Sequence, residues 1–232
     1  FIDERIIEAS ELIQLGKIQD AEVLYEKLIR SGFKDSRIYT NLASICYTKN
    51  QITEMIRLLN IAINIDPNYH FAYYNLGLAL KTKRDFNASI QAFEKAINLK
   101  PDFPEAFNSL GNLFKEKDDI DSAISQYQQA IKLDPKYVDA YYNLGNIFIL
   151  KGHLKSAITL LKQSIKLQPN HVNSYWDLAL AQLLEGNYKD GLRNYEWRWK
   201  MKKKPHAEPK IKLYTGKLNE MSESLLVISE QG

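Results

Sequence analysis

Short amide and carboxyl side chains recur in the chain at intervals of 34 residues. Asn41 and Asn75 lie one interval apart, and Asn143 follows two intervals later. The intervening and following places in the same register hold Ser109 and Asp177. An asparagine amide carries both hydrogen-bond donors and an acceptor, so a row of amides suits the backbone of an extended peptide. The chemistry that this register predicts is therefore peptide recognition.

Two further positions of the same register carry polar or aromatic side chains. When each interval is numbered from 1 to 34 with Ser36 at position 1, the row described above is position 6. Position 9 contributes two amides, and position 5 contributes three rings that suit the apolar parts of a bound segment. The alternative is that position 6 hydrogen-bonds the neighbouring repeat and that the rings cover the edge of their own helix. The candidate peptide-binding residues are Asn41, Asn75, Ser109, Asn143, Asp177, Asn112, Asn146, Tyr74, Tyr142 and Trp176.

The interval that relates these residues runs through most of the chain. Proline recurs every 34 residues, at Pro67, Pro101, Pro135 and Pro169. Self-similarity at a fixed period of this length is typical of solenoid proteins, so we divide the chain into six repeats. They span residues 2–35, 36–69, 70–103, 104–137, 138–171 and 172–200.

Each repeat is predicted to be a hairpin of two helices. In the third repeat Tyr73, Leu76, Gly77 and Leu80 follow the i, i+3, i+4, i+7 spacing of one helical stripe, and the second half repeats that spacing. Gly77 weakens an isolated helix by about 1 kcal/mol. We therefore expect close approach of the partner helix, with the small residue at position 20 facing the glycine. Because neither helix buries its stripe alone, the hairpins must stack into an all-α solenoid.

These features resemble the tetratricopeptide repeat, from residue 2 to about residue 200. The shared features are the period, Tyr/Phe-x-x-Leu-Gly in the first helix, alanine at position 20, an aromatic residue at position 24 and proline at position 32. The first repeat departs from the pattern, with Glu8 at position 7 and Phe33 at position 32. The resemblance implies a right-handed superhelix of about six hairpins, with the first helix of each hairpin on the concave wall.

The amide row has a counterpart in one branch of that family. In the repeats of protein O-linked N-acetylglucosamine transferases, a ladder of position-6 asparagines holds the substrate chain. This sequence is similar at Asn41, Asn75 and Asn143 and departs at Ser109 and Asp177. The resemblance therefore implies a peptide groove whose ladder is interrupted in the fourth and sixth repeats.

The repeats give way to a different kind of sequence after about residue 200. Residues 201–224 begin with a basic, proline-containing stretch and are predicted to be a linker, and residues 225–232, "LLVISEQG", read as a strand running into a loop. Trp197 and Trp199 either form a capping helix or contact a segment beyond the repeats. Ile149, Leu150, Leu183 and Leu184, at positions 12 and 13, make the last part of the inner wall apolar, as a seat for a ligand or a further domain. "YEWRW" and "LLVISEQG" together resemble bacterial proteins in which such repeats run into a glycosyltransferase-like domain.

Composition and motifs exclude several other classes. A net charge of +3 is too small to predict nucleic-acid binding, and no apolar run is long enough for a membrane span. Single-stranded RNA binding also needs a basic groove, whereas the inner positions mix both signs. A lone cysteine, Cys46, suits a cytoplasmic protein. No catalytic motif, cofactor loop or metal-ligand spacing is present, since the four histidines fall at unrelated repeat positions.

The sequence thus leaves two functions open. The first is a non-catalytic protein- or peptide-binding scaffold that serves as the recognition arm of a glycosyltransferase-like protein. The second is a freestanding adaptor that assembles a protein complex. In both, the predicted partner is a protein segment in the concave groove, without cofactor, metal or nucleic acid.

Overall fold

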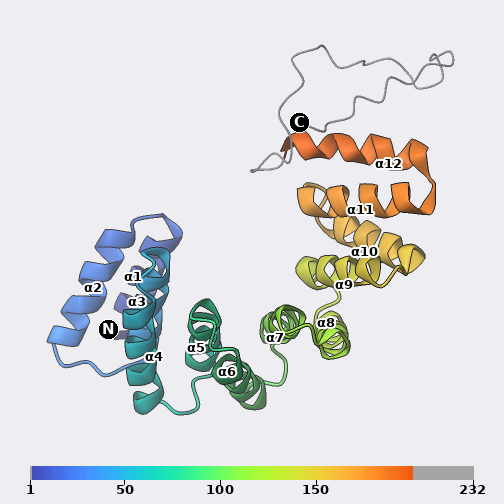
Figure 1. Ribbon diagram of the computed structural model, residues 1–232. Coiled ribbons are helices and arrows are strands. Elements are labelled where there is room, and N and C mark those ends of the chain that lie inside the picture. The colour runs from blue at the N-terminus through green and yellow to red at the C-terminus, as the bar shows by residue number, and fades with distance from the viewer. Residues whose placement is uncertain (1, 201–232) are drawn as a thin grey trace. The chain divides into compact units, whose positions relative to one another are not determined.

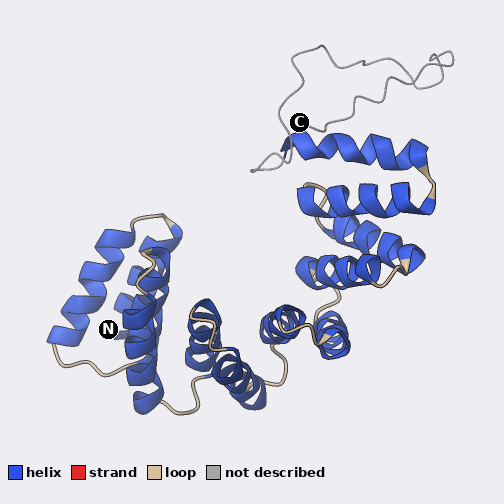
Figure 2. Cartoon of the chain, in the orientation of Figure 1, coloured by secondary structure: helices blue, strands red, loops and turns tan. Residues whose placement is uncertain are grey.

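The computed structural model describes residues 2–200, with side chains from Glu4 onward, and this part of the chain is entirely helical (Figures 1 and 2). The predicted all-α fold of stacked helical hairpins is confirmed. The predicted linker 201–224 and strand 225–232 lie outside the described residues. The helices are α1 (Ile2–Gln14), α2 (Ile18–Arg30), α3 (Ser36–Thr48), α4 (Ile52–Ile65), α5 (His70–Thr82), α6 (Phe86–Leu99), α7 (Pro104–Glu116), α8 (Ile120–Leu133), α9 (Val138–Leu150), α10 (Leu154–Leu167), α11 (Val172–Glu185), α12 (Tyr188–Tyr195) and the 3-10 helix η1 (Glu196–Lys200).

The chain divides into two compact units, one up to Ile147 and one from Phe148 onward, so that α9 crosses the boundary. In the first unit each helix from α1 to α7 packs against the next one in sequence, and the first helices of consecutive hairpins also contact one another: α1 with α3, α3 with α5, and α5 with α7. The second helices α2, α4, α6 and α8 make no such contacts among themselves. The first helices therefore form the more closely packed side of this unit. None of the helices between residues 2 and 200 combines the length and hydrophobicity needed to span a bilayer.

The turn between the two helices of a hairpin has the same backbone conformation in all six repeats. Position 15 has a positive φ each time, and the next N–H donates to the carbonyl of position 11, as at Asp119 and Phe114, 2.9 Å apart. This is the hydrogen bond of a Schellman motif, which favours glycine at the left-handed residue. The residues at position 15 are Gly16, Asn50, Arg84, Asp118, Gly152 and Gly186.

Replacing Asp118 by glycine is expected to raise the free energy of unfolding by about 1 kcal/mol. Asp118 adopts φ 63°, where an L-residue with a Cβ is strained by about 1–2 kcal/mol, and the greater entropy of unfolded glycine offsets part of the gain. Denaturant titration followed by circular dichroism measures the change. Asp118→Asn is the control, since it removes the charge and keeps the Cβ; equal stabilisation by both variants would point to charge and not to backbone strain.

Gly77 and Gly111, at position 8 of the third and fourth repeats, lie under an aromatic ring of the partner helix. A Cβ added to Gly77 would lie 2.7 Å from the Phe93 ring, and one added to Gly111 would lie 2.7 Å from the Tyr127 ring. The predicted close approach is present, but the residue against the glycine comes from position 24 and not from position 20. In the third repeat, position 20 contacts the glycine through a hydrogen bond: the Ser89 hydroxyl donates to the Gly77 carbonyl at 2.7 Å.

The second unit ends in a stack of aromatic rings. Trp197 of η1 lies parallel to Tyr175 of α11, with ring centroids 3.7 Å apart. The Arg198 guanidinium lies between the rings of Tyr195 and Trp199, 4.2 and 4.4 Å from their centroids. Such stacking combines apolar burial with cation–π attraction. Trp197 thus folds back onto α11, whereas Trp199 contacts Arg198 and Glu196 of its own helix.

Candidate peptide-binding face

The predicted site residues of the first unit lie mainly on the closely packed side, on helices α3, α5 and α7. We call the surface formed there by positions 2, 6, 9 and 12 the first-helix face. Neighbouring helices on this face are joined by polar side chains, such as Lys81 of α5 and Glu116 of α7, whose Nζ and Oε1 atoms are 2.6 Å apart. The face consists of Arg37, Asn41, Ser44, Tyr47, Phe71, Asn75, Leu78, Lys81, Glu105, Ser109, Asn112 and Lys115.

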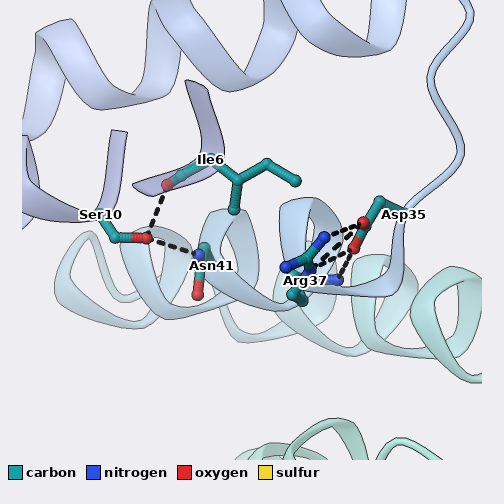
Figure 3. A network of polar contacts seen from close by, with 5 residues as sticks. All are labelled: Ile6, Ser10, Asp35, Arg37 and Asn41. Atoms are coloured by element: carbon teal, nitrogen blue, oxygen red, sulfur yellow. Dashed lines mark hydrogen bonds and ion pairs between the residues drawn. The ribbon is translucent and has the colours of Figure 1, made fainter. Parts of the chain in front are cut away.

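Asn41 is bound to the first repeat. Its amide nitrogen donates to the hydroxyl of Tyr25, at 2.8 Å, and approaches the hydroxyl of Ser10, at 3.3 Å. Ser10 in turn donates to the carbonyl of Ile6, as Figure 3 shows. Tyr25 is fully buried, so these groups supply the partners that its hydroxyl needs. At Asn41 the amide therefore joins two hairpins, as the alternative interpretation of position 6 expected.

Two more position-6 side chains reach position 5 of the preceding repeat. Asn143 donates to the Oδ1 atom of Asn108 at 2.9 Å, and the Ser109 hydroxyl lies 3.3 Å from the Tyr74 hydroxyl. Both pairs are separated by 35 residues, which places them at equivalent points of successive interfaces. Position 6 in these repeats contributes to packing between hairpins.

Asn75 differs from these residues. Its counterpart 35 residues earlier is Thr40, whose buried Oγ1 atom has no hydrogen-bond partner. The position-24 residue of that repeat is Leu59, which offers no hydroxyl of the kind that Tyr25 offers to Asn41. The half-buried amide of Asn75 consequently makes no hydrogen bond to any residue that the structure describes. It is the position-6 amide whose donors and acceptor are available to a ligand.

The position-9 amides also have partners within the fold. Asn112 accepts a 2.7 Å hydrogen bond from the hydroxyl of Tyr127, and burial raises the pKa of that tyrosine far above its usual range. Asn146 accepts a 2.6 Å hydrogen bond from the Nζ atom of Lys115. These amides accept hydrogen bonds from a buried hydroxyl and a charged amine of the first unit. Their place in the repeat did not predict this role.

The position-5 rings and Asp177 are held in packing contacts or are largely buried. The Tyr74 ring lies 5.0 Å from Phe103, and the Trp176 ring stacks on Tyr195 at 5.0 Å. Tyr142 is half-buried and Asp177 is only 8% exposed. All three rings are half-buried, so each is only partly accessible to a ligand.

A cavity of about 460 Å³ opens beside Asn41 and was not predicted from the sequence. Arg37 at its rim is held by Asp35, with 2.6 Å between Nη2 and Oδ2, and this guanidinium keeps the pKa of the Asp35 carboxyl below its usual range (Figure 3). Tyr69 reaches the cavity from the end of the same repeat. The cavity is lined by Ile6, Ile7, Ser10, Glu11, Gln14, Arg37, Asn41 and Tyr69.

A cluster of rings joins the end of the second repeat to the third repeat. Phe71 is 41% exposed and lies 5.5 Å from Phe103 and 5.8 Å from Tyr69. His70 packs 4.2 Å from Phe71, its Nε2 atom is buried without a partner, and burial together with the charge of Lys100 lowers its pKa. The imidazole is therefore an uncharged member of the cluster at neutral pH. Within residues 2–200 no group of His, Cys, Asp and Glu is placed to hold a metal ion.

Position 13 of the last two repeats is apolar and exposed. Leu150 and Leu184, one period apart, are 68% and 67% exposed. The equivalent positions of the second to fourth repeats hold Thr48, Thr82 and Glu116, so the polar character of this register changes along the chain. The two leucines remain candidates for contact with an apolar ligand or a further domain.

Comparison with known proteins identifies the repeat. A family model described as TPR repeat matches residues 111–152 and 145–186, and one described as tetratricopeptide repeat matches residues 36–69 and 72–103. No curated protein sequence matches the chain.

Several solved structures share the fold. MamA is 26% identical, with a TM-score of 0.60 over 67% of this chain and 91% of MamA. YrrB, described as a TPR protein with an unusual peptide-binding site, is 20% identical, with a TM-score of 0.58 over 75% of this chain and 89% of YrrB. PilF of Pseudomonas aeruginosa is 18% identical, with a TM-score of 0.66 over 70% of this chain and 74% of PilF. The family models together match more than half of the 232 residues, and the chain belongs to the tetratricopeptide repeat family.

Proposed function

We propose that the chain is a protein-binding scaffold that holds an extended peptide segment along the first-helix face of its first unit. The observation that carries the proposal is the side chain of Asn75, which has no partner within residues 2–200. A half-buried amide without partners loses hydrogen bonds to water that a peptide backbone can replace. Asn75 lies midway along α5. This helix packs between α3 and α7, which contribute to the same face.

The surroundings of Asn75 offer contacts for the side chains of such a segment. Phe71, one turn before Asn75, presents an exposed ring, and Leu78, one turn after it, is half-buried. The cavity beside Asn41 provides a pocket with apolar and polar walls. An amide for the backbone and alternating apolar pockets for side chains are the two requirements of extended-peptide recognition. The relative YrrB, whose description includes peptide binding, supports the same class of ligand.

Asn75→Ala is expected to weaken binding of an extended peptide about tenfold, the effect of losing one or two hydrogen bonds. The melting temperature should stay unchanged, because Asn75 makes no hydrogen bond within the fold. The probe is a fluorescein-labelled 12-residue peptide selected on the wild-type chain from a random library, and anisotropy gives its Kd. Asn98→Ala, an exposed amide on the outer surface of α6, is the matched control. Equal affinities of Asn75→Ala and Asn98→Ala would show that Asn75 does not contact the peptide.

We further propose that this scaffold is the recognition arm of a glycosyltransferase-like protein. The support is the resemblance of "YEWRW" at residues 195–199 and "LLVISEQG" at residues 225–232 to proteins of that organisation. The coding sequence beyond Gly232 tests this directly. Alternating strands and helices after "EQG" are the expected result, whereas an early stop codon would leave a freestanding adaptor.

A further inference from the structure

The cavity beside Asn41 lies where α1 meets the first-helix face, and it is large enough for one long side chain. Its volume of about 460 Å³ falls within the range of roughly 300–1,000 Å³ that is usual for ligand pockets. The lining comes from α1, from α3 and from Tyr69 at the end of the second repeat. Ile6 and Ile7 supply apolar walls, and Ile7 is 55% exposed. An alkyl stem can therefore lie along these walls.

The two charged residues that line this cavity, Glu11 and Arg37, do not offer their charges equally to a ligand. The Arg37 guanidinium is already held by the Asp35 carboxylate, with 2.6 Å between Nη2 and Oδ2. Glu11 is exposed, and its side chain makes no ion pair or hydrogen bond to any residue that the structure describes. The charge that the cavity presents to a ligand is therefore negative.

The hydrogen-bonding groups of the lining leave acceptors for a ligand. The Asn41 amide nitrogen already donates to the hydroxyls of Tyr25 and Ser10. The Ser10 hydroxyl donates to the Ile6 carbonyl (Figure 3). The Oδ1 atom of Asn41 accepts no hydrogen bond within residues 2–200, and the Glu11 carboxylate adds two more acceptor oxygens. Ammonium and guanidinium groups, which donate hydrogen bonds and accept none, complement such a lining.

We propose that the cavity beside Asn41 binds a lysine or arginine side chain of the peptide segment, and that Glu11 selects its positive charge. This assignment rests on the proposed function, since the first-helix face must hold the segment. The alkyl stem of the basic residue lies along Ile6 and Ile7, and its cationic head reaches the Glu11 carboxylate. Tyr69 lines the same cavity, and aromatic rings attract cations over their faces.

The packing of the helices places this basic residue within the segment. Asn41 and Asn75 occupy the same position of α3 and α5, and these two helices are in contact. Packed helices lie roughly 8–10 Å apart, and an extended chain advances roughly 3.3 Å per residue. The basic residue is therefore expected about three residues from the one that contacts Asn75.

Anisotropy with the selected, fluorescein-labelled peptide tests the assignment, and this peptide is expected to contain a lysine or arginine. Glu11→Gln is expected to weaken its binding about fivefold, the upper range for an ion pair that remains in contact with water. Glu94→Gln removes the same charge from an exposed glutamate on α6 and is the matched control, with an expected change below about twofold. Norleucine in place of the peptide's basic residue should weaken binding to the wild type about fivefold and leave binding to Glu11→Gln unchanged.

The outcomes separate this assignment from the proposed function. A selected peptide without lysine or arginine would overturn the assignment, and so would equal losses in Glu11→Gln and Glu94→Gln. Equal Kd values for the wild type and Glu11→Gln would also overturn it, whereas a loss in Asn75→Ala in the same assay would still support the proposed function. A loss in Glu11→Gln with an unchanged Kd in Asn75→Ala would support the cavity and contradict the contact proposed for Asn75.

Discussion

Gly111→Val is expected to lower the free energy of unfolding by about 3 kcal/mol, the cost of adding bulk to a close-packed core. A Cβ at this position would lie 2.7 Å from Cε1 and 2.8 Å from Cδ1 of Tyr127. That ring is fully buried and its hydroxyl is bound to Asn112, so it has no free direction in which to move. Either the two helices separate or the hydrogen bond breaks. Urea titration followed by circular dichroism measures the loss.

Ser125→Val is the control for Gly111→Val. Ser125 is exposed on α8, so valine there costs only its lower helix propensity, a few tenths of a kcal/mol. If packing against Tyr127 is the cause, the stability loss from Gly111→Val should shrink in a Tyr127→Ala background. The reason is that the free-energy effects of mutations at two residues in contact do not add. Equal stability of the Gly111→Val and Ser125→Val variants would contradict the packing argument.

The register of the helices could be predicted from the sequence because it depends on local patterns. The first helices begin at the first residue of each predicted repeat, such as Ser36 for α3 and Pro104 for α7. The period, the apolar spacing and the turn chemistry all determine these boundaries, and they agree with one another. The contacts of Gly77 were predicted only in part, since Ser89 at position 20 does contact it but the Phe93 ring at position 24 lies nearest to an added Cβ. That choice depends on the crossing of two helices, which the spacing of one helix does not define.

The role of each position-6 side chain could not be predicted, because it depends on a residue in another repeat. Asn41 is bound since Tyr25 and Ser10 are within reach, whereas Asn75 faces a repeat with Leu59 in place of that tyrosine. The same residue type at the same position therefore has two roles. The residue at position 24 of the preceding repeat distinguishes the two roles: it is Tyr25 for Asn41 and Leu59 for Asn75.

The unpredicted cavity beside Asn41 has a similar origin. It brings together Ile7 and Gln14 of α1, Arg37 of α3 and Tyr69 from the loop before α5. The cavity combines positions of the first helices, such as Ile7 at position 6 and Arg37 at position 2, with Tyr69 at position 34, which lies in a loop. Three consecutive repeats contribute to the cavity or to the rings beside it, and their meeting point depends on the stacking of the hairpins.

Tyr25→Ala is expected to have the largest effect on stability, a loss of about 4 kcal/mol in the free energy of unfolding. The Tyr25 side chain is fully buried in the core of the first unit, and its hydroxyl lies 3.0 Å from Ser10 and 2.8 Å from Asn41. Alanine removes the ring and leaves both polar partners without this hydroxyl. Tyr25→Phe keeps the ring and should cost about 1–2 kcal/mol, the penalty for a lost hydrogen bond in a buried network. Tyr47→Ala, at an exposed ring on α3, should stay within about 0.5 kcal/mol of the wild type.

A double-mutant cycle of Tyr25→Phe and Asn41→Ala then tests whether position 6 is structural at this repeat. The two substitutions break the same hydrogen bond, so their combined cost should fall below the sum by about 1 kcal/mol. In a second cycle, Asn75→Ala replaces Asn41→Ala and is combined with Tyr25→Phe. The two stability losses should then add, since Asn75 makes no hydrogen bond within residues 2–200. Additivity in both cycles would mean that Asn41 does not depend on Tyr25, and Asn41 would then join Asn75 as an amide available to a peptide.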